Sequence, residues 1–296
     1  MTDVLGTCES WGDGLVAVRR ERGDLVTIPT DDIVSGKTVP PRPSPLRRLD
    51  PEDADRRAHP GWRPVEEEQL GQWLLRASGG FSNRGNSVLA LGDPGVPLRE
   101  AIERVTEWYD ARGLTPRAHV VADSPLVYAL DEADWSVYEP TGLMLTSVAR
   151  ALRHTDPSDQ RVRHDTAVDA GWLATDERAA RFGDAARQVL EAGEVTFATV
   201  RADDGSVLAR GRGSFHDDWL GISSLWTAEE HRGQGLGTAV LRSLLDWGAE
   251  GGATTAYLQV VESNEAAARL YEARGFEKHH GYAYYRAPFP DGSEQD

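Results

Sequence analysis

The sequence predicts a mixed α/β protein with a mostly antiparallel sheet and flanking helices. Two observations carry this prediction. Segments 73–146 and 195–286 both read as the same succession, strand, strand, helix, strand, helix, strand. In the second segment a glycine-rich turn, residues 231–238, joins an apolar strand to a helical pattern. We therefore expect two related lobes in tandem, preceded by a small β unit.

The small β unit is expected to cover residues 1–45. Segments 14–20 and 24–28 read as strands on either side of a turn at 21–23. Residues 38–45 are rich in proline, which favours an extended chain over a core element. The N-terminal unit is therefore predicted to be separate from the rest of the chain.

The first lobe is expected at residues 64–150, after a charged linker at 46–63. Its predicted elements are strands 73–78 and 81–91, helix 98–110, strand 117–121, helix 125–133 and a strand region at 135–146. The turn 92–97, which precedes the first helix, contains Asp93 and two prolines. Prolines lack N–H donors and the aspartate is anionic, so this turn is predicted not to bind an anion.

The second lobe is expected at residues 160–290. Its predicted elements are strands 195–200, 207–214 and 219–227, helix 235–250, strand 254–261, helix 264–274 and strand 276–286. Ser263 or Asn264 can cap the second of these helices, and Gly275 can end it. This lobe therefore repeats the order of the first.

The glycine-rich turn of the second lobe favours anion binding. Glycines let the backbone approach a ligand closely, and the first N–H groups of a helix point toward an anion. The backbone groups expected to face a phosphate are those of Gly233, Gln234, Gly235, Leu236, Gly237 and Thr238, with Arg232 beside them. Taken alone, the turn is also compatible with an ordinary tight connection from strand to helix.

Two motifs resemble one known family. Residues 232–237 fit R-x-x-G-x-G, and this resembles the pyrophosphate loop of the Gcn5-related N-acetyltransferases (GNAT), which bind acetyl-CoA. A second segment is similar to that family's L-x-V-x-x-x-N-x-x-A-x-x-L-Y-x-x-x-G-F at Leu258, Val260, Asn264, Ala267, Leu270, Tyr271, Gly275 and Phe276. The resemblance implies an acetyl-CoA-dependent N-acetyltransferase that acts on a primary amine. Residues 1–45 resemble the SH3-like modules placed before some actinobacterial members, although such a barrel needs about five strands and this segment supplies about four.

The resemblance also implies roles for individual residues. The backbone of Leu225, Trp226 and Thr227 would bind the pantetheine arm like an added strand, and an N–H near Leu225 would stabilise the oxyanion. Asn264 would bond the CoA arm, and Tyr271 would protonate the departing sulfur. The alternatives are that Leu225 and Trp226 are core residues and that Tyr271 is a packed helix tyrosine.

The general base is not assigned by the sequence. Many relatives use a glutamate on the fourth strand, whereas the corresponding stretch 219–224 has no carboxylate. Residues 216–218 and Glu262 are candidates, and an amine bound in its neutral form would need no base. An acetyl-CoA-binding sensor or interaction protein without turnover therefore stays open as the alternative function. The acceptor, small molecule or protein, is not indicated.

The composition limits the classes of partner, cellular location and metal site that we expect for the protein. The formal net charge is −16, which disfavours nucleic acid as the main partner. No apolar run approaches membrane-spanning length and no secretory signal begins the sequence, so a cytoplasmic location is expected. Cys8 is the single cysteine, which excludes internal disulfides and cysteine-rich metal sites. His279 and His280 are adjacent in a strand and should point to opposite faces, so no metal is expected. The sequence does not indicate whether the protein forms an oligomer.

Overall fold

The computed structural model describes residues 3–20, 24–37, 45–157 and 159–288, which form two compact units divided after residue 44. The predicted turn at 21–23 and the proline-rich segment up to residue 44 lie outside the described residues. The second unit contains both predicted lobes.

The N-terminal unit contains a three-stranded antiparallel sheet in the order β1 (Thr7–Gly12), β2 (Leu15–Arg19), β3 (Leu25–Pro29). The two strands predicted here are present, and β1 is an additional one. Val16 is the only buried side chain among the described residues of this unit, and Trp11 is 68% exposed. The described strands number three, against the four expected, and form an open sheet.

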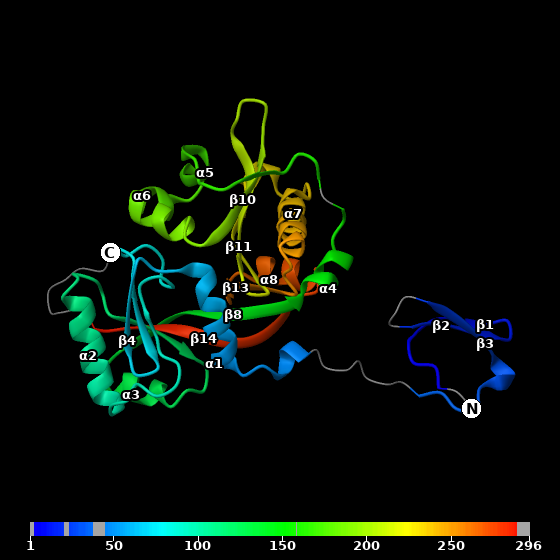
Figure 1. Ribbon diagram of the computed structural model, residues 1–296, viewed down its shortest axis with the longest axis horizontal. Coiled ribbons are helices and arrows are strands. Elements are labelled where there is room, and N and C mark those ends of the chain that lie inside the picture. Colours follow the sequence, from blue (N-terminus) through cyan, green and yellow to red (C-terminus); the bar gives the residue numbers. More distant parts are fainter. Residues whose placement is uncertain (1–2, 21–23, 38–44, 158, 289–296) are drawn as a thin grey trace. The chain divides into compact units, whose positions relative to one another are not determined.

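Residues 45–288 build one eleven-stranded sheet with helices packed against it (Figure 1). The strand order is β4 (Glu66–Leu70), β5 (Trp73–Ala77), β6 (Val88–Leu89), β7 (Arg117–Val121), β14 (Glu277–Arg286), β8 (Ser136–Ser147), β13 (Thr255–Val261), β12 (Trp219–Thr227), β11 (Val207–His216), β10 (Glu194–Arg201), β9 (Arg163–Asp165). Two neighbouring pairs, β6 with β7 and β12 with β13, are parallel, and the others are antiparallel. The predicted mixed, mostly antiparallel sheet is confirmed.

The two predicted lobes share this sheet. The last strand, β14, pairs with β7 on one side and with β8 on the other, although β7 and β8 both belong to the predicted first lobe. In turn, β8 pairs with β13 of the second lobe over the full length of β13. The lobes are thus joined through β14 and β8, without a boundary in the sheet.

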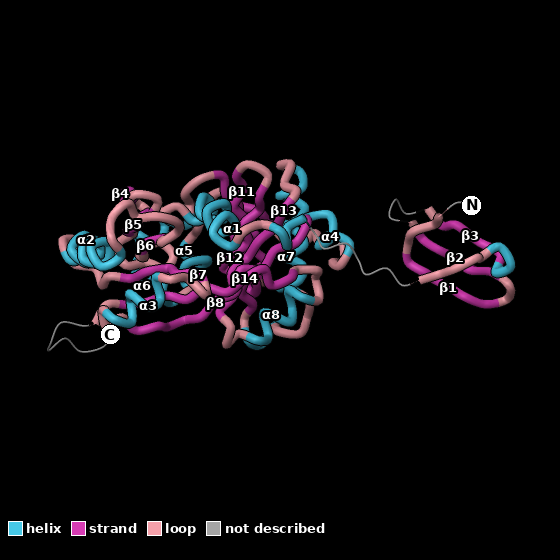
Figure 2. The backbone as a smooth tube through the Cα atoms, turned by 90° about the horizontal axis from the view of Figure 1, so that it is seen from below, coloured by secondary structure: helices cyan, strands magenta, loops and turns pink. Residues whose placement is uncertain are grey.

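The helices cover both faces of the sheet (Figure 2). They are α1 (Pro51–Ala58), α2 (Leu98–Asp110), α3 (Leu126–Glu132), α4 (Val148–Arg153), α5 (Ala170–Ala174), α6 (Glu177–Leu190), α7 (Leu236–Glu250) and α8 (Glu265–Glu272). Alternate residues of single strands meet opposite helices. Leu143 and Leu145 of β8 cluster with α1, whereas Met144 between them clusters with α4 and α7. This period of two is that of a strand buried on both faces.

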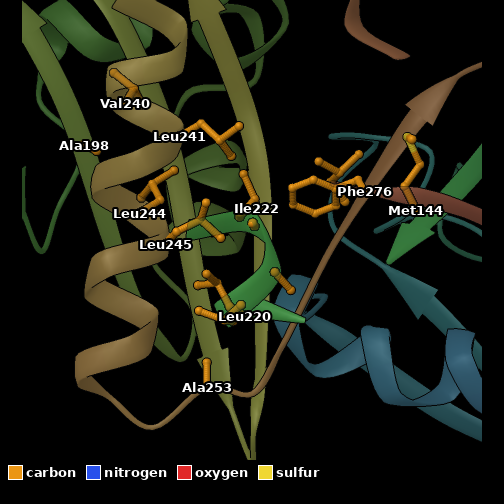
Figure 3. Close-up of a cluster of buried hydrophobic side chains, with 14 of the residues drawn as sticks. Met144, Ala198, Leu220, Ile222, Val240, Leu241, Leu244, Leu245, Ala253 and Phe276 are labelled. Atoms are coloured by element: carbon orange, nitrogen blue, oxygen red, sulfur yellow. The ribbon is translucent and has the colours of Figure 1, made fainter. Parts of the chain in front are cut away.

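Helix α7 anchors the core of the second lobe. Figure 3 shows Val240, Leu241, Leu244 and Leu245 turned toward the sheet strands, and each of these side chains is fully buried. Their spacing at i, i+1, i+4 and i+5 produces one apolar face of a helix. The predicted helix at 235–250 is confirmed, and its N-terminus is fixed by this packing.

The predicted strand at 81–91 is wrong apart from the two residues of β6. Residues 81–87 form a loop that the Asn86 side chain holds together. Its Oδ1 accepts hydrogen bonds from the backbone N–H groups of Ser78 and Gly80, each 2.8 Å, and its Nδ2 donates to the carbonyls of Phe81 and Ser82. These local bonds replace the strand partners that an extended backbone would need.

The predicted linker at 46–63 is also wrong, because it contains α1 within the fold. Asp50 caps this helix by accepting a hydrogen bond from the Glu52 N–H at 2.9 Å, and Pro51 occupies the first turn. The next strand, β4, was missed because Glu66, Glu67 and Glu68 give it no apolar alternation. It is one of the two edge strands of the sheet, where charged side chains are tolerated and discourage further pairing.

Helix α1 is tied to the sheet by a buried carboxylate. Asp55 Oδ2 lies 2.8 Å from His119 Nε2 on β7 and 3.2 Å from His280 Nε2 on β14. Burial alone would raise the pKa of Asp55, but the charge and hydrogen bonds of the two histidines outweigh it and hold that pKa below its usual range. Burial lowers the pKa of His119, against the influence of Asp55. The chain therefore keeps a charged group inside the interface of α1, β7 and β14.

Replacing Asp55 with alanine is expected to lower the free energy of unfolding by about 3 kcal/mol, because two buried histidines lose their acceptor. The lowered pKa values of Asp55 and His119 mean that the unfolded chain takes up protons first on acidification. The free energy of unfolding of the wild type should therefore decrease as the pH falls below about 6.5, where His119 of the unfolded chain takes up a proton. It should decrease further below about pH 4, where Asp55 of the unfolded chain does so. Urea unfolding across this range measures both effects. Asp53→Ala, an exposed position on the same helix, is the control, and an equal loss there would contradict the assignment.

Candidate active site

The glycine-rich turn leads directly into α7. Gly233 and Gly235 have φ of +76° and +80°, a region that side chains other than glycine rarely adopt, and Gly235 is the residue before the helix. At Gly237 a Cβ atom would lie 3.1 Å from Thr227 Oγ1, so the start of the helix lies close against the end of β12. The loop thus directs the first N–H groups of a fifteen-residue helix outward beside this strand.

Strands β12 and β13 separate halfway along β12. They pair in parallel from Trp219 with Thr255 to Ile222 with Leu258, and beyond this point no pairing connects them among the described residues. We call the point of separation the fork. Two buried polar atoms adjoin it, Ser223 Oγ and Gln259 Oε1, and neither has a hydrogen-bond partner in the described part of the chain. The fork therefore offers polar groups that the fold itself does not use.

A β-bulge turns β12 away at the fork. On the partner strand β11, Arg210 pairs with Trp226 and Arg212 with Ser223, so two residues of β12 face one of β11. Ser224 in the bulge has φ of +54°. The buried Arg210 donates from Nη1 to the Ser224 carbonyl at 2.6 Å. Arg210 was not predicted as a site residue, and it holds the bulge in place.

The predicted residues of β12 divide between the two sides of the strand. Leu225 packs against the apolar cluster under α7, which is what the alternative role of a core residue predicted. Trp226 lines a hollow of about 550 Å³ beside Arg232. Three carboxylates, Asp204, Glu229 and Glu230, also line this hollow and make it unsuitable for phosphates. The backbone of Thr227 accepts a long hydrogen bond, 3.4 Å, from Arg232 Nε.

Tyr271 and Asn264 both lie on or next to α8. Tyr271 packs against the α7 cluster and contacts Phe276 with its ring edge, the centroids 6.0 Å apart. Burial raises the pKa of Tyr271 to about 12. Asn264 is exposed and caps α8, with its Oδ1 accepting from the Ala267 N–H at 3.1 Å. The amide NH₂ of Asn264 is left to contact a ligand.

A pocket of about 220 Å³ opens on the other side of the fork. We call it the fork pocket. It is lined by Ser223, Ser224, Gln259 and Val261 from the two separating strands, by Glu139, Thr141, Tyr282 and Tyr284 from the strands β8 and β14, and by Trp62, Ser82, Asn83, Arg84 and Arg178 from other segments. Both predicted lobes contribute side chains to it.

The sequence is similar to those of known proteins. The family described as "Probable histone acetyltransferase Rv0428c C-terminal" matches residues 44–285. The N-acetyltransferase YobR of Bacillus subtilis, which is described as uncharacterized, is 30% identical over 233 residues, covering 75% of this chain and 92% of that protein. The probable histone acetyltransferase Rv0428c of Mycobacterium tuberculosis is 28% identical over 294 residues, 97% of this chain and 89% of that protein.

The chain is a Gcn5-related N-acetyltransferase of this family.

Solved structures agree on the fold of this acetyltransferase. A GCN5-related N-acetyltransferase from Kribbella flavida matches with a TM-score of 0.57 and 20% identity, covering 84% of this chain and 97% of that one. A tandem GNAT protein from the clavulanic acid biosynthesis pathway matches with a TM-score of 0.53 and 14% identity, covering 81% and 89%. The predicted membership of the family is confirmed, and the SH3-like character of residues 1–45 stays a prediction.

One cation near the glycine loop escaped prediction. Arg274 follows α8 and donates from Nη2 to Thr238 Oγ1, 3.2 Å away, at the start of α7. The acetyltransferase therefore has two arginines, Arg232 and Arg274, beside the loop. The position of Arg274 after the helix carried no signal in the sequence, because only folding brings the end of α8 to the start of α7.

The candidate bases named from the sequence are engaged elsewhere. His216 Nε2 lies 2.8 Å from the Arg57 carbonyl, and Asp218 Oδ2 accepts from Thr254 Oγ1 at 2.5 Å. His216 ends β11 and Asp218 lies in the turn to β12, away from the fork. Asp217 belongs to the same turn and has φ of +50°. Glu262 pairs with Lys278, 2.6 Å apart. The carboxylate that lines the fork pocket is Glu139, which no sequence motif singled out.

The arrangement of His279 and His280 corrects another expectation. A β-bulge between Lys278 and His280 shifts the register of β14 against β8. As a result the two histidine rings do not point to opposite faces, and their Nδ1 atoms lie 2.8 Å apart. Within the described ranges, no group of three or more His, Cys, Asp or Glu side chains is arranged to hold a metal ion. Nor does any described helix have the length and apolar character needed to cross a membrane.

In the corresponding turn of the first lobe, backbone N–H groups donate hydrogen bonds to side chains of the protein itself. Asp93 N–H donates to Gln72 Oε1 at 2.7 Å, and Gly95 N–H donates to Asp93 Oδ1 at 2.8 Å. The carboxylate of Asp93 thus takes a position that an anionic ligand would need. That turn 92–97 does not bind an anion stays a prediction.

Proposed function

We propose that the protein transfers the acetyl group of acetyl-CoA to a primary amine. The observation that carries this proposal is the fork itself, with the glycine loop at the start of α7 on one side and the fork pocket on the other. A thioester lying in the fork would have its phosphate end at the loop and its carbonyl open toward an amine in the pocket.

The residues present fit acetyl-CoA. The N–H groups of residues 233–238 and the positive end of the α7 dipole suit a pyrophosphate, with Arg232 and Arg274 adding positive charge to a chain of net charge −16. Beyond Ile222, no described strand pairs with the edge of β12 that faces β13, and the amides of a pantetheine arm can bond there as an added strand. The NH₂ group of Asn264 is available to the same arm.

The transfer exchanges two bonds for two others. The amine nitrogen bonds to the acetyl carbonyl carbon, the carbon–sulfur bond breaks, and one proton passes from nitrogen to sulfur. A backbone N–H near Leu225 would stabilise the oxyanion formed on attack. Tyr271 is protonated at neutral pH, as any tyrosine of ordinary pKa is, and burial raises its pKa further, to about 12. Its hydroxyl would protonate the sulfur.

A second candidate function is an acetyl-CoA sensor or interaction protein without turnover. The observation that favours it is that β12 carries no carboxylate along residues 219–227. Glu139 in the fork pocket weakens this alternative, because it supplies a carboxylate from another strand. The family description and the relative Rv0428c are both named as probable histone acetyltransferases, so the experiment that tests the proposal also includes a basic protein acceptor.

Thiol release from acetyl-CoA, measured across small amines and a lysine-rich peptide, tests the proposal together with calorimetric binding of acetyl-CoA. Binding with thiol release for one class of amine is the expected result. Binding with no release for any amine would favour the sensor. Absence of binding would contradict the assignment of the loop at 232–237 and the proposal with it.

A further inference from the structure

The fork pocket contains opposite charges that do not neutralise each other. Glu139 lines it from β8, and Arg84 and Arg178 line it from the loop 81–87 and from α6. No ion pair joins Glu139 to either arginine, and neither arginine has a carboxylate partner in the part of the chain that the structure describes. Two unpaired arginines in one pocket are unexpected in a chain of net charge −16. This pattern suits a ligand that carries both signs of charge.

The backbone turns Glu139 into the pocket by a strained bulge. Opposite β14, Tyr138 pairs with Tyr284 and Thr141 with Tyr282, so Glu139 is in a bulge of β8. Its φ of +49° is unfavourable for a residue with a side chain. Asn83 Nδ2 donates to Glu139 Oε2 at 3.0 Å, and the Tyr138 hydroxyl donates to Asn83 Oδ1 at 3.2 Å. The carboxylate is thereby oriented, and its Oε1 is left for an ammonium group.

Arg84 is positioned with an unused donor. Its guanidinium lies over the ring of Trp62, 5.0 Å from the ring centre, and its Nε is buried without a hydrogen-bond partner among the described residues. The loop that carries it is held by the side chain of Asn86. A stacked, planar guanidinium with free N–H groups matches a carboxylate or a phosphate. Arg178 is exposed and adds a second positive charge at the same pocket.

We propose that the acceptor is a small amine that also carries an anionic group, with its ammonium at Glu139 and its anion at Arg84 and Arg178. This inference rests on the proposed function and specifies its substrate class. A volume of about 220 Å³ accommodates a molecule of amino-acid size. A lysine-rich protein tail fits less well, because the two arginines repel its neighbouring positive charges.

The test compares matched pairs of acceptors at one pH. Each of a set of α-, β- and ω-amino acids is paired with its own amide, and phosphoethanolamine is paired with ethanolamine. A preference of at least about tenfold in kcat/KM for the anionic member is expected. In the amino-acid pairs, intrinsic reactivity cannot explain this preference, because the amide has the more acidic ammonium and supplies more free amine. A preference within the amino-acid pairs would indicate that the site binds a carboxylate, and a preference for phosphoethanolamine over ethanolamine that it binds a phosphate.

Variants of the pocket residues identify which side chains cause the preference for the anionic acceptor. Arg84→Gln is expected to reduce the ratio of kcat/KM for the anionic acceptor to that for the neutral acceptor toward one, mainly by lowering kcat/KM for the anionic member. Arg178→Gln, at an exposed position that folding tolerates, should reduce the ratio in the same direction. Arg181→Gln, three residues further along α6 and outside the pocket lining, is the control and should keep the ratio. Glu139→Gln should raise KM for both members of a pair.

Equal use of both members, a preference for the neutral member, or acetylation of a lysine-rich peptide while no anionic amine is used would overturn the inference and leave the proposed function standing. A ratio that is unchanged in both Arg84→Gln and Arg178→Gln would also overturn it. Absence of thiol release with every amine and peptide would overturn the proposed transfer reaction, and this inference with it.

Discussion

Replacing Tyr271 with phenylalanine is expected to lower kcat by about 10²-fold while the Kd for acetyl-CoA stays within about twofold of wild type. The substitution removes a hydroxyl proton and keeps the ring that packs against Phe276 and the α7 cluster. The acid form of Tyr271 is lost only as the pH rises through about 12. In wild type, kcat/KM should therefore not decline through this group between about pH 7 and 10. Steady-state kinetics and calorimetry measure these effects.

The control for Tyr271→Phe is Tyr285→Phe. Tyr285 is a buried tyrosine of β14 that belongs to the core cluster of the first lobe. Loss of its hydroxyl should leave kcat unchanged. If Tyr271→Phe turned over acetyl-CoA at the wild-type rate with the preferred amine, Tyr271 would have no part in the chemistry and would be a packing residue.

Replacing Gly235 with valine is expected to raise the Kd for acetyl-CoA at least tenfold. A side chain at φ of +80° is strained by about 1–2 kcal/mol, and a β-branched one more, so the loop must change its conformation. The Cβ itself meets no atom within 4 Å, so the effect comes from the backbone and from the space in front of the helix N-terminus. Calorimetric titration with acetyl-CoA, and separately with CoA, measures it.

Gly252→Val is the matched control for the loop. Gly252 has φ of +96° and equally open surroundings, but it lies just beyond the other end of α7. Both variants should lose a similar amount of thermal stability, whereas only Gly235→Val should lose affinity. Equal affinities for acetyl-CoA in the two variants would separate the glycine loop from binding.

The elements predicted most accurately from the sequence are those whose apolar periodicity and end signals lie within the element and its immediate flanks. Helix 98–110 and strands 117–121 and 219–227 have the predicted bounds, because apolar periodicity and flanking turn residues define them locally. Helix α1 was missed although Asp50 and Pro51 give its start signal, since its surface is largely charged. The edge strand β4 was missed because three consecutive glutamates show no alternation.

The loop and helix that bind the cosubstrate in our proposal were predictable, because R-x-x-G-x-G and the segment around Tyr271 are continuous in the chain. The fork pocket was not. Glu139 and Arg84 are far apart in the sequence and from Ser223, and each depends on a local irregularity, a bulge or a loop fixed by Asn86. Such irregularities interrupt periodicity, so methods that depend on periodicity do not find them.

The position of β14 has a consequence for how the protein is made. A ribosome synthesises β7 and β8 more than 120 residues before β14, yet β14 separates them in the finished sheet. Until β14 emerges, each of these strands has an open edge that faces no partner, and that edge is prone to pair with other chains. Completion of the sheet thus waits for contacts of long sequence separation, which form slowly. We expect the nascent protein to rely on chaperones at this stage, and its two lobes not to fold when produced as separate fragments.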